Sequence, residues 1–210
     1  MKLAASKNTG GKIRLYEHNG AEVPSVTTVL GYIENDSWLD SWKRKVGTRE
    51  AEKIRTDAAA FGTRVHALVA GADVVRVSDR ERRCAQGAID WLYKNVDEVL
   101  AYELKMADRE LGFGGTVDVI ARMTNGATAI IDWKTSKKLT PHNNLQTAGY
   151  AMLAEAAGYD DIDERYVVRL WKDEQVGRVS TRKCVNPADY DAFRAAVTYW
   201  HWAHPGAAKV

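Results

Sequence analysis

Cysteine is scarce in this chain of 210 residues, which contains only two. Cys84 and Cys184 lie far apart and form no CxxC pair. This excludes a disulfide framework and a four-cysteine zinc or iron–sulfur site. Apolar runs of about 18 residues, which a membrane-spanning helix needs, are also absent. The first residues lack the apolar stretch of a secretory signal. We therefore expect a protein of a reducing compartment, the cytoplasm.

Net charge is nearly absent as well. Lysine and arginine total 30 and aspartate and glutamate 28, a net charge of +2, so overall charge does not by itself indicate a nucleic-acid partner. GxGxxG, Walker A, GxSxG and HExxH motifs are missing, which argues against the common dinucleotide, nucleotide, serine-hydrolase and zinc-protease sites. A hydrophobic content of 45% suffices for an ordinary core. We treat residues 1–210 as a single domain.

Hydrophobic periodicity and turn signals predict the order of elements. Residues 1–11 resemble a loose tail, and 12–17 alternate as in a strand that ends at a His18-Asn19-Gly20 turn. A mainly helical part is expected over 24–96, a sheet with one helix over 99–183, and a last helix over 186–204. The predicted helices are 26–34, 48–70, 79–96, 141–157 and one that Asn186-Pro187 opens and that runs to about 203, and the predicted strands are 99–106, 114–123, 127–135, 164–171 and 176–183. This order predicts an α/β fold with a central mixed β-sheet flanked by helices.

Residues 112–138 (GFGGTVDVIARMTNGATAIIDWKTSKK) carry the most informative pattern, two strands around an Asn125-Gly126 turn. Asp132 and Lys134 are two positions apart and therefore point to one face. A two-residue loop would set Asp118 opposite Trp133, on the other face. A three-residue loop, or a bulge with Gly126 in the left-handed region, unites Asp118, Asp132 and Lys134 and leaves the reverse face uniformly apolar. Burial favours this second register.

Two carboxylates and an ammonium group in one half-buried patch predict a metal site, because like charges are costly to bury without a cation. Carboxylate oxygens suit Mg²⁺ or Mn²⁺, which can clamp the oxygens of a phosphodiester during in-line displacement. Lys134 could orient the attacking water or offset charge on phosphorus. A solvated strand face is the alternative explanation of the Asp-x-Lys pattern.

Four other residues are candidates with an equally ordinary structural explanation. His66 lies one helical turn after Gly62 and is either a further metal ligand or a histidine bonded to backbone or water. Glu103 either reaches the metal from a neighbouring strand or lies on the surface. Gln146 and Tyr150 share one helix face and either contact the lysine or a phosphate, or pack the helix on the sheet.

Basic side chains gather between Lys43 and Arg55, where six basic residues and two acids give a local charge of +4. This stretch, with Lys137 and Lys138, could hold a phosphate backbone. A solvated helix face is the alternative. Trp38 and Trp42 are spaced one helical turn apart and either stack on bases or belong to the core.

The order of these motifs resembles the PD-(D/E)XK nucleases, and within them the RecB-type branch. The glycine-rich turn, Asp118, Asp132-Trp133-Lys134 and the Gln146…Tyr150 pair match the core pattern. The helix segment Gly62-Thr63-Arg64-Val65-His66 is similar to the branch's GTxxH-like motif. Val23-Pro24-Ser25-Val26-Thr27 is similar to the PSVT element of the mitochondrial genome maintenance exonuclease group and its phage relatives. One departure is Val117, which stands where the proline of the family name would precede Asp118.

The resemblance implies a restriction-endonuclease-like fold and Mg²⁺-dependent cleavage of DNA, with Mn²⁺ able to substitute and no iron–sulfur cluster. It implies Lys134, Asp118 and Asp132 as catalytic residues, Glu103 as an accessory acid, and Gln146 and Tyr150 as the QxxxY helix. Metal ligands would be His66, Asp118, Asp132 and Trp133. Expected nucleic-acid contacts are Ser25, Thr27, Lys43, Arg44, Lys45, Arg64, Lys137 and Lys138.

These expectations favour an exonuclease that hydrolyses the ends of linear DNA, single-stranded or duplex. Its setting would be recombination, repair or genome maintenance in a bacterial or phage-infected cell, with a single-strand-annealing or single-strand-binding protein as partner. Two alternatives remain: a structure-specific endonuclease with the same metal site, and a catalytically inactive nucleic-acid-binding module.

Overall fold

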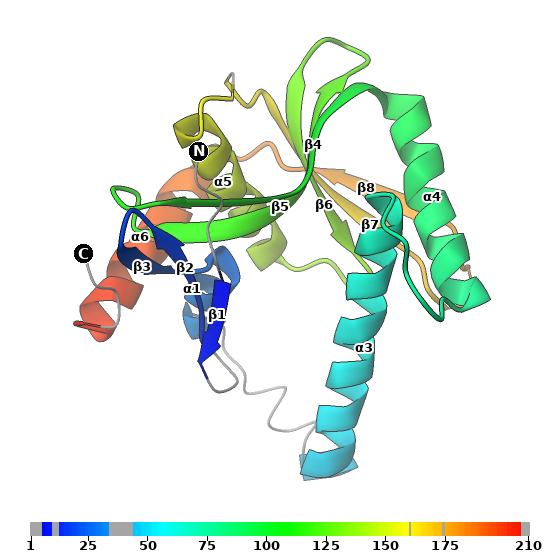
Figure 1. Cartoon of the computed structure of the whole chain (residues 1–210), viewed down its shortest axis with the longest axis horizontal. Helices are drawn as coiled ribbons and strands as arrows, with labels where there is room; N and C mark the ends of the chain where they lie inside the picture. Colours follow the sequence, from blue (N-terminus) through cyan, green and yellow to red (C-terminus); the bar gives the residue numbers. More distant parts are fainter. Residues whose placement is uncertain (1–5, 10–12, 34–43, 160, 174, 207–210) are drawn as a thin grey trace.

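A five-stranded mixed sheet forms the centre of the computed structural model (Figure 1), which describes residues 6–9, 13–33, 44–159, 161–173 and 175–206. The strands follow one another in chain order across the sheet: β4 (Val96–Asp108), β5 (Phe113–Met123), β6 (Thr128–Lys134), β7 (Glu164–Leu170) and β8 (Val179–Lys183). The β6–β7 pair is parallel and the other pairs are antiparallel. The predicted α/β fold with a mixed sheet is confirmed.

Within the described residues, five helices flank this sheet: α1 (Val26–Ile33), α3 (Thr48–Val69), α4 (Asp79–Asn95), α5 (Pro141–Ala156) and α6 (Ala188–Ala203). Their bounds agree with the predicted ranges to within two residues. One core cluster joins α1, α5 and α6 to the sheet, and a second joins α3 and α4 to its other part. None of the described helices is both long and apolar enough to cross a bilayer.

The β5–β6 hairpin adopts the register that burial favoured. Ile120 pairs with Ile130 and Arg122 pairs with Thr128. The Met123 N–H donates to the Ala127 carbonyl at 2.8 Å, which leaves a loop of three residues ending in Gly126, whose φ is 86°. That angle lies in the left-handed region, where glycine avoids the steric cost of a Cβ. Asp118 and Asp132 therefore share one face, as predicted.

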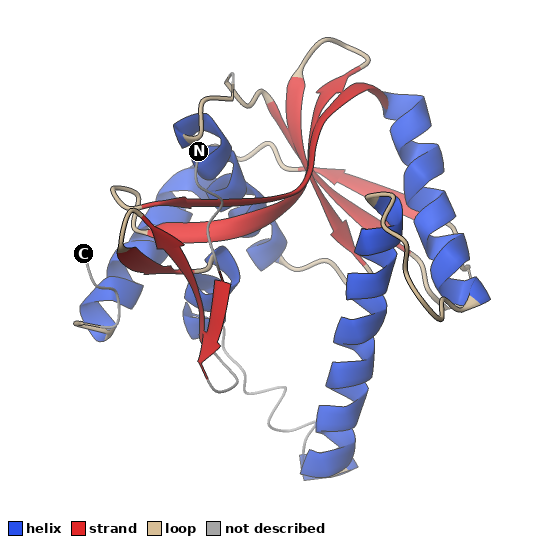
Figure 2. Ribbon diagram, in the orientation of Figure 1, coloured by secondary structure: helices blue, strands red, loops and turns tan. Residues whose placement is uncertain are grey.

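A small second sheet corrects the expectation of a loose tail. β1 (Ser6–Thr9), β2 (Ile13–His18) and β3 (Ala21–Pro24) form an antiparallel sheet beside the first half of β5 (Figure 2). Tyr16 packs so closely on Gly114 that a Cβ there would lie 2.7 Å from the tyrosine side chain. The Tyr16 hydroxyl also lies 2.9 Å from Thr116 Oγ1. The polar β1 segment has no apolar alternation, so its strand state depends on pairing with β2.

A buried ion pair fastens α6 to the sheet. Arg165 of β7 and Asp189 of α6 lie 2.9 Å apart and are 4% and 6% exposed. The guanidinium also donates to the carbonyls of Asn144, Cys184 and Asn186 and lies over the Tyr190 ring. Both charges are thus fully compensated, and removal of either leaves the other buried without a partner.

Replacing Arg165 with methionine should lower the free energy of unfolding by about 3 kcal/mol or more, because Asp189 would remain buried and uncompensated. Arg194→Met on the same helix is the matched control, since Arg194 pairs with Asp191 at the exposed surface and should cost below about 0.5 kcal/mol. Urea denaturation measures both. Equal effects of the two substitutions would contradict a structural role for the buried pair.

Candidate active site

Three elements bring His66, Glu103 and Asp118 together. His66 on α3 places its Nδ1 3.2 Å from Asp118 Oδ1 on β5 and 3.7 Å from Glu103 Oε1 on β4. One ligand atom of each residue lies within 4.8 Å of the others. Among the residues that the structure describes, this is the group of histidine and carboxylate side chains able to share a cation. The cluster contains two predicted ligands, His66 and Asp118. It also contains Glu103, for which the sequence had left open both a role at the metal site and a surface position.

Asp132 and Lys134 lie next to this cluster on β6. Lys134 Nζ is 2.6 Å from Asp132 Oδ2, as expected for residues two apart on one strand face. Asp132 Oδ2 is nevertheless buried without a hydrogen bond of good geometry. Asp118 Oδ2 accepts from the Trp133 backbone N–H at 2.8 Å, which links the two strands at the site.

Trp133 itself points away from the carboxylates. Its ring is 1% exposed and meets Trp91 edge-on, with ring centroids 5.7 Å apart. Because side chains alternate along the strand, Trp133 lies in the core while Asp132 and Lys134 face the site. The predicted metal contact of Trp133 can come only from its backbone, since its side chain carries no ligand for a hard cation.

Gly62 lets α3 approach the end of β6. A Cβ at this position would lie 3.3 Å from Thr135 Oγ1, which is tighter than an ordinary contact. The glycine thus makes room for the strand end next to Lys134. His66 comes one turn later on the same face, so this close approach also sets its distance from Asp118.

Burial and charge shift the pKa values of the cluster. Burial alone would lower the pKa of His66, but Asp118, with Glu103 and Asp132, outweighs it and raises the value to about 10. Burial pushes the pKa of Asp118 upward, yet His66, Lys134 and the Trp133 N–H hold it below its usual value. For Asp132, burial and the Asp118 charge outweigh Lys134 and raise the pKa to about 6. The site thus holds excess negative charge that a cation would stabilise.

Glu103 has a left-handed backbone, with a φ of 46°. It lies between Tyr102 and Leu104, which pair with Val119 and Val117, so it stands opposite Asp118. A side chain in this region costs of order 1 kcal/mol. The strain directs the Glu103 carboxylate to the cluster.

A cavity of about 560 Å³ opens over the cluster, lined by residues of β2, α3, β4, β5 and α5. Tyr150 belongs to its wall and fits because Gly115 carries no side chain, since a Cβ there would lie 2.7 Å from the ring. Gln146 Nε2 donates to the Tyr150 hydroxyl at 2.8 Å. Burial, with Asp132 and Asp118 nearby, raises the pKa of Tyr150 well above its usual value. The phenol therefore keeps its proton and has it free for another acceptor.

The predicted nucleic-acid contacts divide into two groups. Ser25 is 2% exposed and its Oγ accepts from the Thr28 N–H at 2.9 Å, so it caps α1. Arg64 Nε contacts Glu81 Oε1 of α4 at 2.5 Å, which gives it a structural partner. Both side chains thus have partners within the fold, and their contact with nucleic acid stays a prediction. Exposed candidates are Thr27, Arg44, Lys45, Lys137 and Lys138, whereas Lys43, Trp38 and Trp42 lie outside the described residues.

Sequence reasoning missed three groups near the cluster. Arg14 and Tyr16 on β2 and Lys105 on β4 line the same cavity. They have no motif of their own; Arg14 and Tyr16 come near the site because β2 packs on β5, and Lys105 because β4 pairs with β5. The alternation of residues 12–17 was the one available signal, and it predicted the strand without its position.

A family model with the description "PD-(D/E)XK nuclease superfamily" matches residues 76–199, more than half of the chain. The chain belongs to this superfamily. The matched range contains Glu103, Asp118, Asp132, Lys134, Gln146 and Tyr150, whereas His66 precedes it. The superfamily implies a nuclease, that is, a phosphodiester hydrolase with a nucleic acid as substrate.

Two further comparisons add less. No curated protein matches the chain. A solved structure described as the crystal structure of SSO0001 is 12% identical, with 87% of this chain and 76% of that chain covered and a TM-score of 0.44.

The residues of this PD-(D/E)XK chain fit a divalent cation. The ligand atoms of His66, Glu103 and Asp118 converge, and Asp132 adds a second buried carboxylate next to them, whose Oδ2 pairs with Lys134 Nζ. Carboxylate oxygens with one imidazole suit Mg²⁺ or Mn²⁺ better than a soft metal. The geometry therefore agrees with the divalent metal that the superfamily usually uses.

Replacing Asp118 with asparagine should weaken Mg²⁺ binding at least tenfold, because the buried charge at the centre of the cluster is lost. Isothermal titration calorimetry with Mg²⁺ measures the affinity. Asp97→Asn, at an exposed position of β4, serves as control. An unchanged titration in the Asp118 variant would remove it from the ligand set.

The Glu103→Gly variant should have a free energy of unfolding about 1 kcal/mol higher than that of Glu103→Ala, because only glycine adopts a φ of 46° without strain. At Lys105 on the same strand the order should reverse, since φ there is not positive and glycine weakens a strand interior. Thermal unfolding of the four variants measures both differences. A preference for alanine at both positions would show that Glu103 is unstrained.

Proposed function

We propose that the protein is a Mg²⁺-dependent DNA exonuclease of the RecB-type branch that hydrolyses phosphodiester bonds at the ends of linear DNA. Recombination, repair or genome maintenance in a bacterial or phage-infected cell would be its setting. The observation that carries the proposal is the convergence of His66, Glu103 and Asp118 at one cavity, with the Asp132–Lys134 pair next to them on β6. The motif order similar to the genome maintenance exonuclease group supports the choice of DNA ends.

The carboxylates and His66 would hold the metal, which supplies positive charge to stabilise the phosphodiester during displacement and to acidify water. Glu103, Asp118 and Asp132 would provide oxygen ligands. His66 would add a nitrogen in its neutral form, after losing the proton that the bare carboxylates favour. Strand pairing and the Trp133 N–H hold Asp118 in place before substrate arrives, which lowers the reorganisation needed during reaction.

Lys134 is the charged donor nearest to Asp132. In hydrolysis, water attacks phosphorus, the bond to the leaving oxygen breaks, and that oxygen takes up a proton. An ammonium group beside the reacting phosphate stabilises the charge that accumulates on its oxygens. Asp132 keeps Lys134 oriented on the strand face. Tyr150, with its proton available, can donate to a phosphate oxygen from the α5 side of the cavity.

A gel time course tests the proposal, with linear and closed-circular DNA, each as single strand and duplex, in Mg²⁺ and in EDTA. Loss of linear species in Mg²⁺ with circles spared is the expected result and would show the strand preference. Nicked or cut circles would mean a structure-specific endonuclease. Binding without cleavage in Mg²⁺ or Mn²⁺ would mean an inactive binding module.

Lys134→Ala should reduce cleavage by at least about a hundredfold while DNA affinity in EDTA changes little, because its charge acts on the transition state. Lys94→Ala, an exposed position at the end of α4, is the control and should cleave as wild type. Single-turnover rates and fluorescence anisotropy separate chemistry from binding. Cleavage at the wild-type rate would exclude Lys134 from the mechanism.

A further inference from the structure

We propose that Arg14, Lys105 and Arg55 form a phosphate-binding track that positions the DNA strand at the cluster, and that the Ser25–Thr28 segment acts by anchoring Arg14. This inference rests on the proposed function. It assigns substrate binding to Arg14 and Lys105, which belong to no recognisable motif, and to Arg55 of the basic stretch. It also replaces the expected direct contact of Ser25 with DNA by an indirect role.

The cavity is lined by both negative and positive side chains. Glu103 and Asp118 line one part of it and would repel a phosphodiester on their own. Arg14 and Lys105 line the same cavity and supply two positive charges. Neither side chain forms an ion pair with a described residue, so their charge is available to a ligand. A polyanionic strand is the ligand that the superfamily implies and that two free cations beside carboxylates would hold.

Hydrogen bonds to its backbone hold Arg14 at the cavity. The Arg14 N–H donates to Thr28 Oγ1 at 3.0 Å, and the Arg14 carbonyl accepts from the Ser25 N–H at 2.8 Å and from the Thr28 hydroxyl at 3.2 Å. Ser25 in turn caps α1 through the Thr28 N–H. The segment therefore fixes β2 against α1. Tyr16, two residues on and on the same strand face, bonds to Thr116 of β5.

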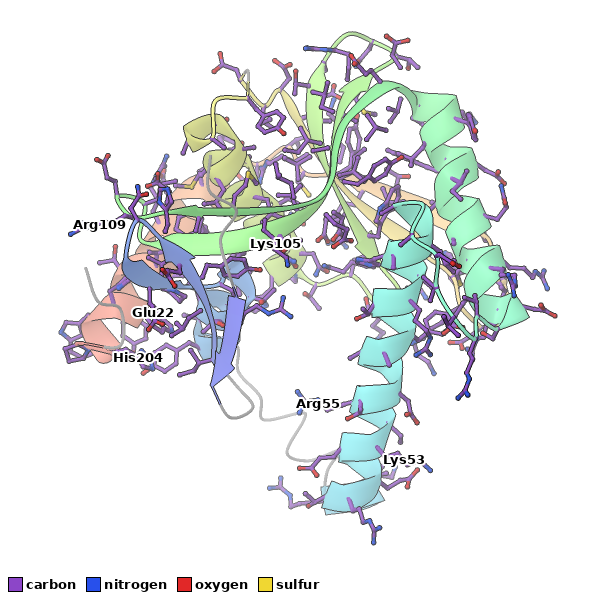
Figure 3. The ribbon with its side chains drawn as sticks, viewed as in Figure 1. Glu22, Lys53, Arg55, Lys105, Arg109 and His204 are labelled. Carbon is purple, nitrogen blue, oxygen red and sulfur yellow. The ribbon has the colours of Figure 1, made fainter. Side chains whose placement is uncertain are left out.

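Arg55 extends the track along α3. It precedes His66 by eleven residues, which brings it to nearly the same helix face about 16 Å away. Figure 3 shows Arg55 on the side of α3 that faces the small N-terminal sheet, and Lys53 on the opposite side. Lys105 lies on β4 between these two parts of the molecule. A strand that runs along this face of α3 would meet Arg55 before it reaches the cluster.

The test measures binding of a fluorescein-labelled single strand in EDTA by anisotropy at several salt concentrations. Each lost phosphate contact should lower the slope of log K against log [salt] by about 0.7. Arg14→Gln, Lys105→Gln and Arg55→Gln should each do so and weaken binding roughly fivefold at moderate salt. Lys53→Gln, on the opposite face of the same helix, should match wild type.

A second pair of variants tests whether Thr28 anchors Arg14. Thr28→Val removes the hydroxyl that bonds to Arg14 and should lower the slope as Arg14→Gln does, whereas Thr28→Ser restores it. A melting temperature within a few degrees of wild type shows that the fold is retained. If Thr28→Val unfolds the protein, the Arg14 variant alone decides the question.

The outcomes separate this proposal from the proposed function. Wild-type slopes in the Arg14 and Lys105 variants, with cleavage intact, would overturn the track and leave the exonuclease. If the Arg14 and Lys105 variants have reduced salt slopes but the wild-type protein cuts no DNA, the phosphate-binding track is supported and the proposed exonuclease activity is wrong. A wild-type chain that binds neither single-stranded nor duplex DNA would overturn the track outright.

Discussion

The register between β5 and β6 is the constraint on which the site depends. A loop of three residues with Gly126 at positive φ brings Asp118 and Asp132 to one face, and a slip of one residue would send one of them into the apolar core. That core face holds Trp133 between the two charged residues of β6. Burial of apolar side chains therefore fixes the geometry of polar ones, and the chemistry follows from the packing on the reverse face.

Assembly of this site has local costs that the surrounding fold offsets. Like charges are buried close together, the backbone of Glu103 is strained, and Gly62, Gly114 and Gly115 replace side chains at close approaches. Each feature weakens the fold by a modest amount. The two core clusters and the Arg165–Asp189 pair hold the strands and helices that keep these groups in place. Concentration of strain and buried charge in one cavity is typical of a functional site.

The sequence predicted those parts of the molecule that depend on local chemistry. Helix bounds, the mixed sheet and the hairpin register followed from periodicity, caps and an Asn-Gly turn, because each is decided within a few residues. β1 was missed because its strand state comes from pairing. The pairing of Arg64 with Glu81 was not predicted, because a polar residue in a motif carries no sign of its tertiary partner. The close approach of Thr135 to Gly62 likewise follows from the tertiary fold and has no signal in the sequence around either residue.

The residues of the site come from two parts of the chain. Residues 76–199, which match the superfamily, contain the carboxylates and Lys134. Residues before this range contribute His66 and Arg14 to the cavity, and these two come there through the packing of α3 and β2 on the central sheet. Within the matched range, Lys105 adds one cation beside the carboxylates of the cavity. Arg14, from the earlier residues, adds another, so under the proposed function the shared core would supply the bond cleavage and the preceding elements would help to position the strand.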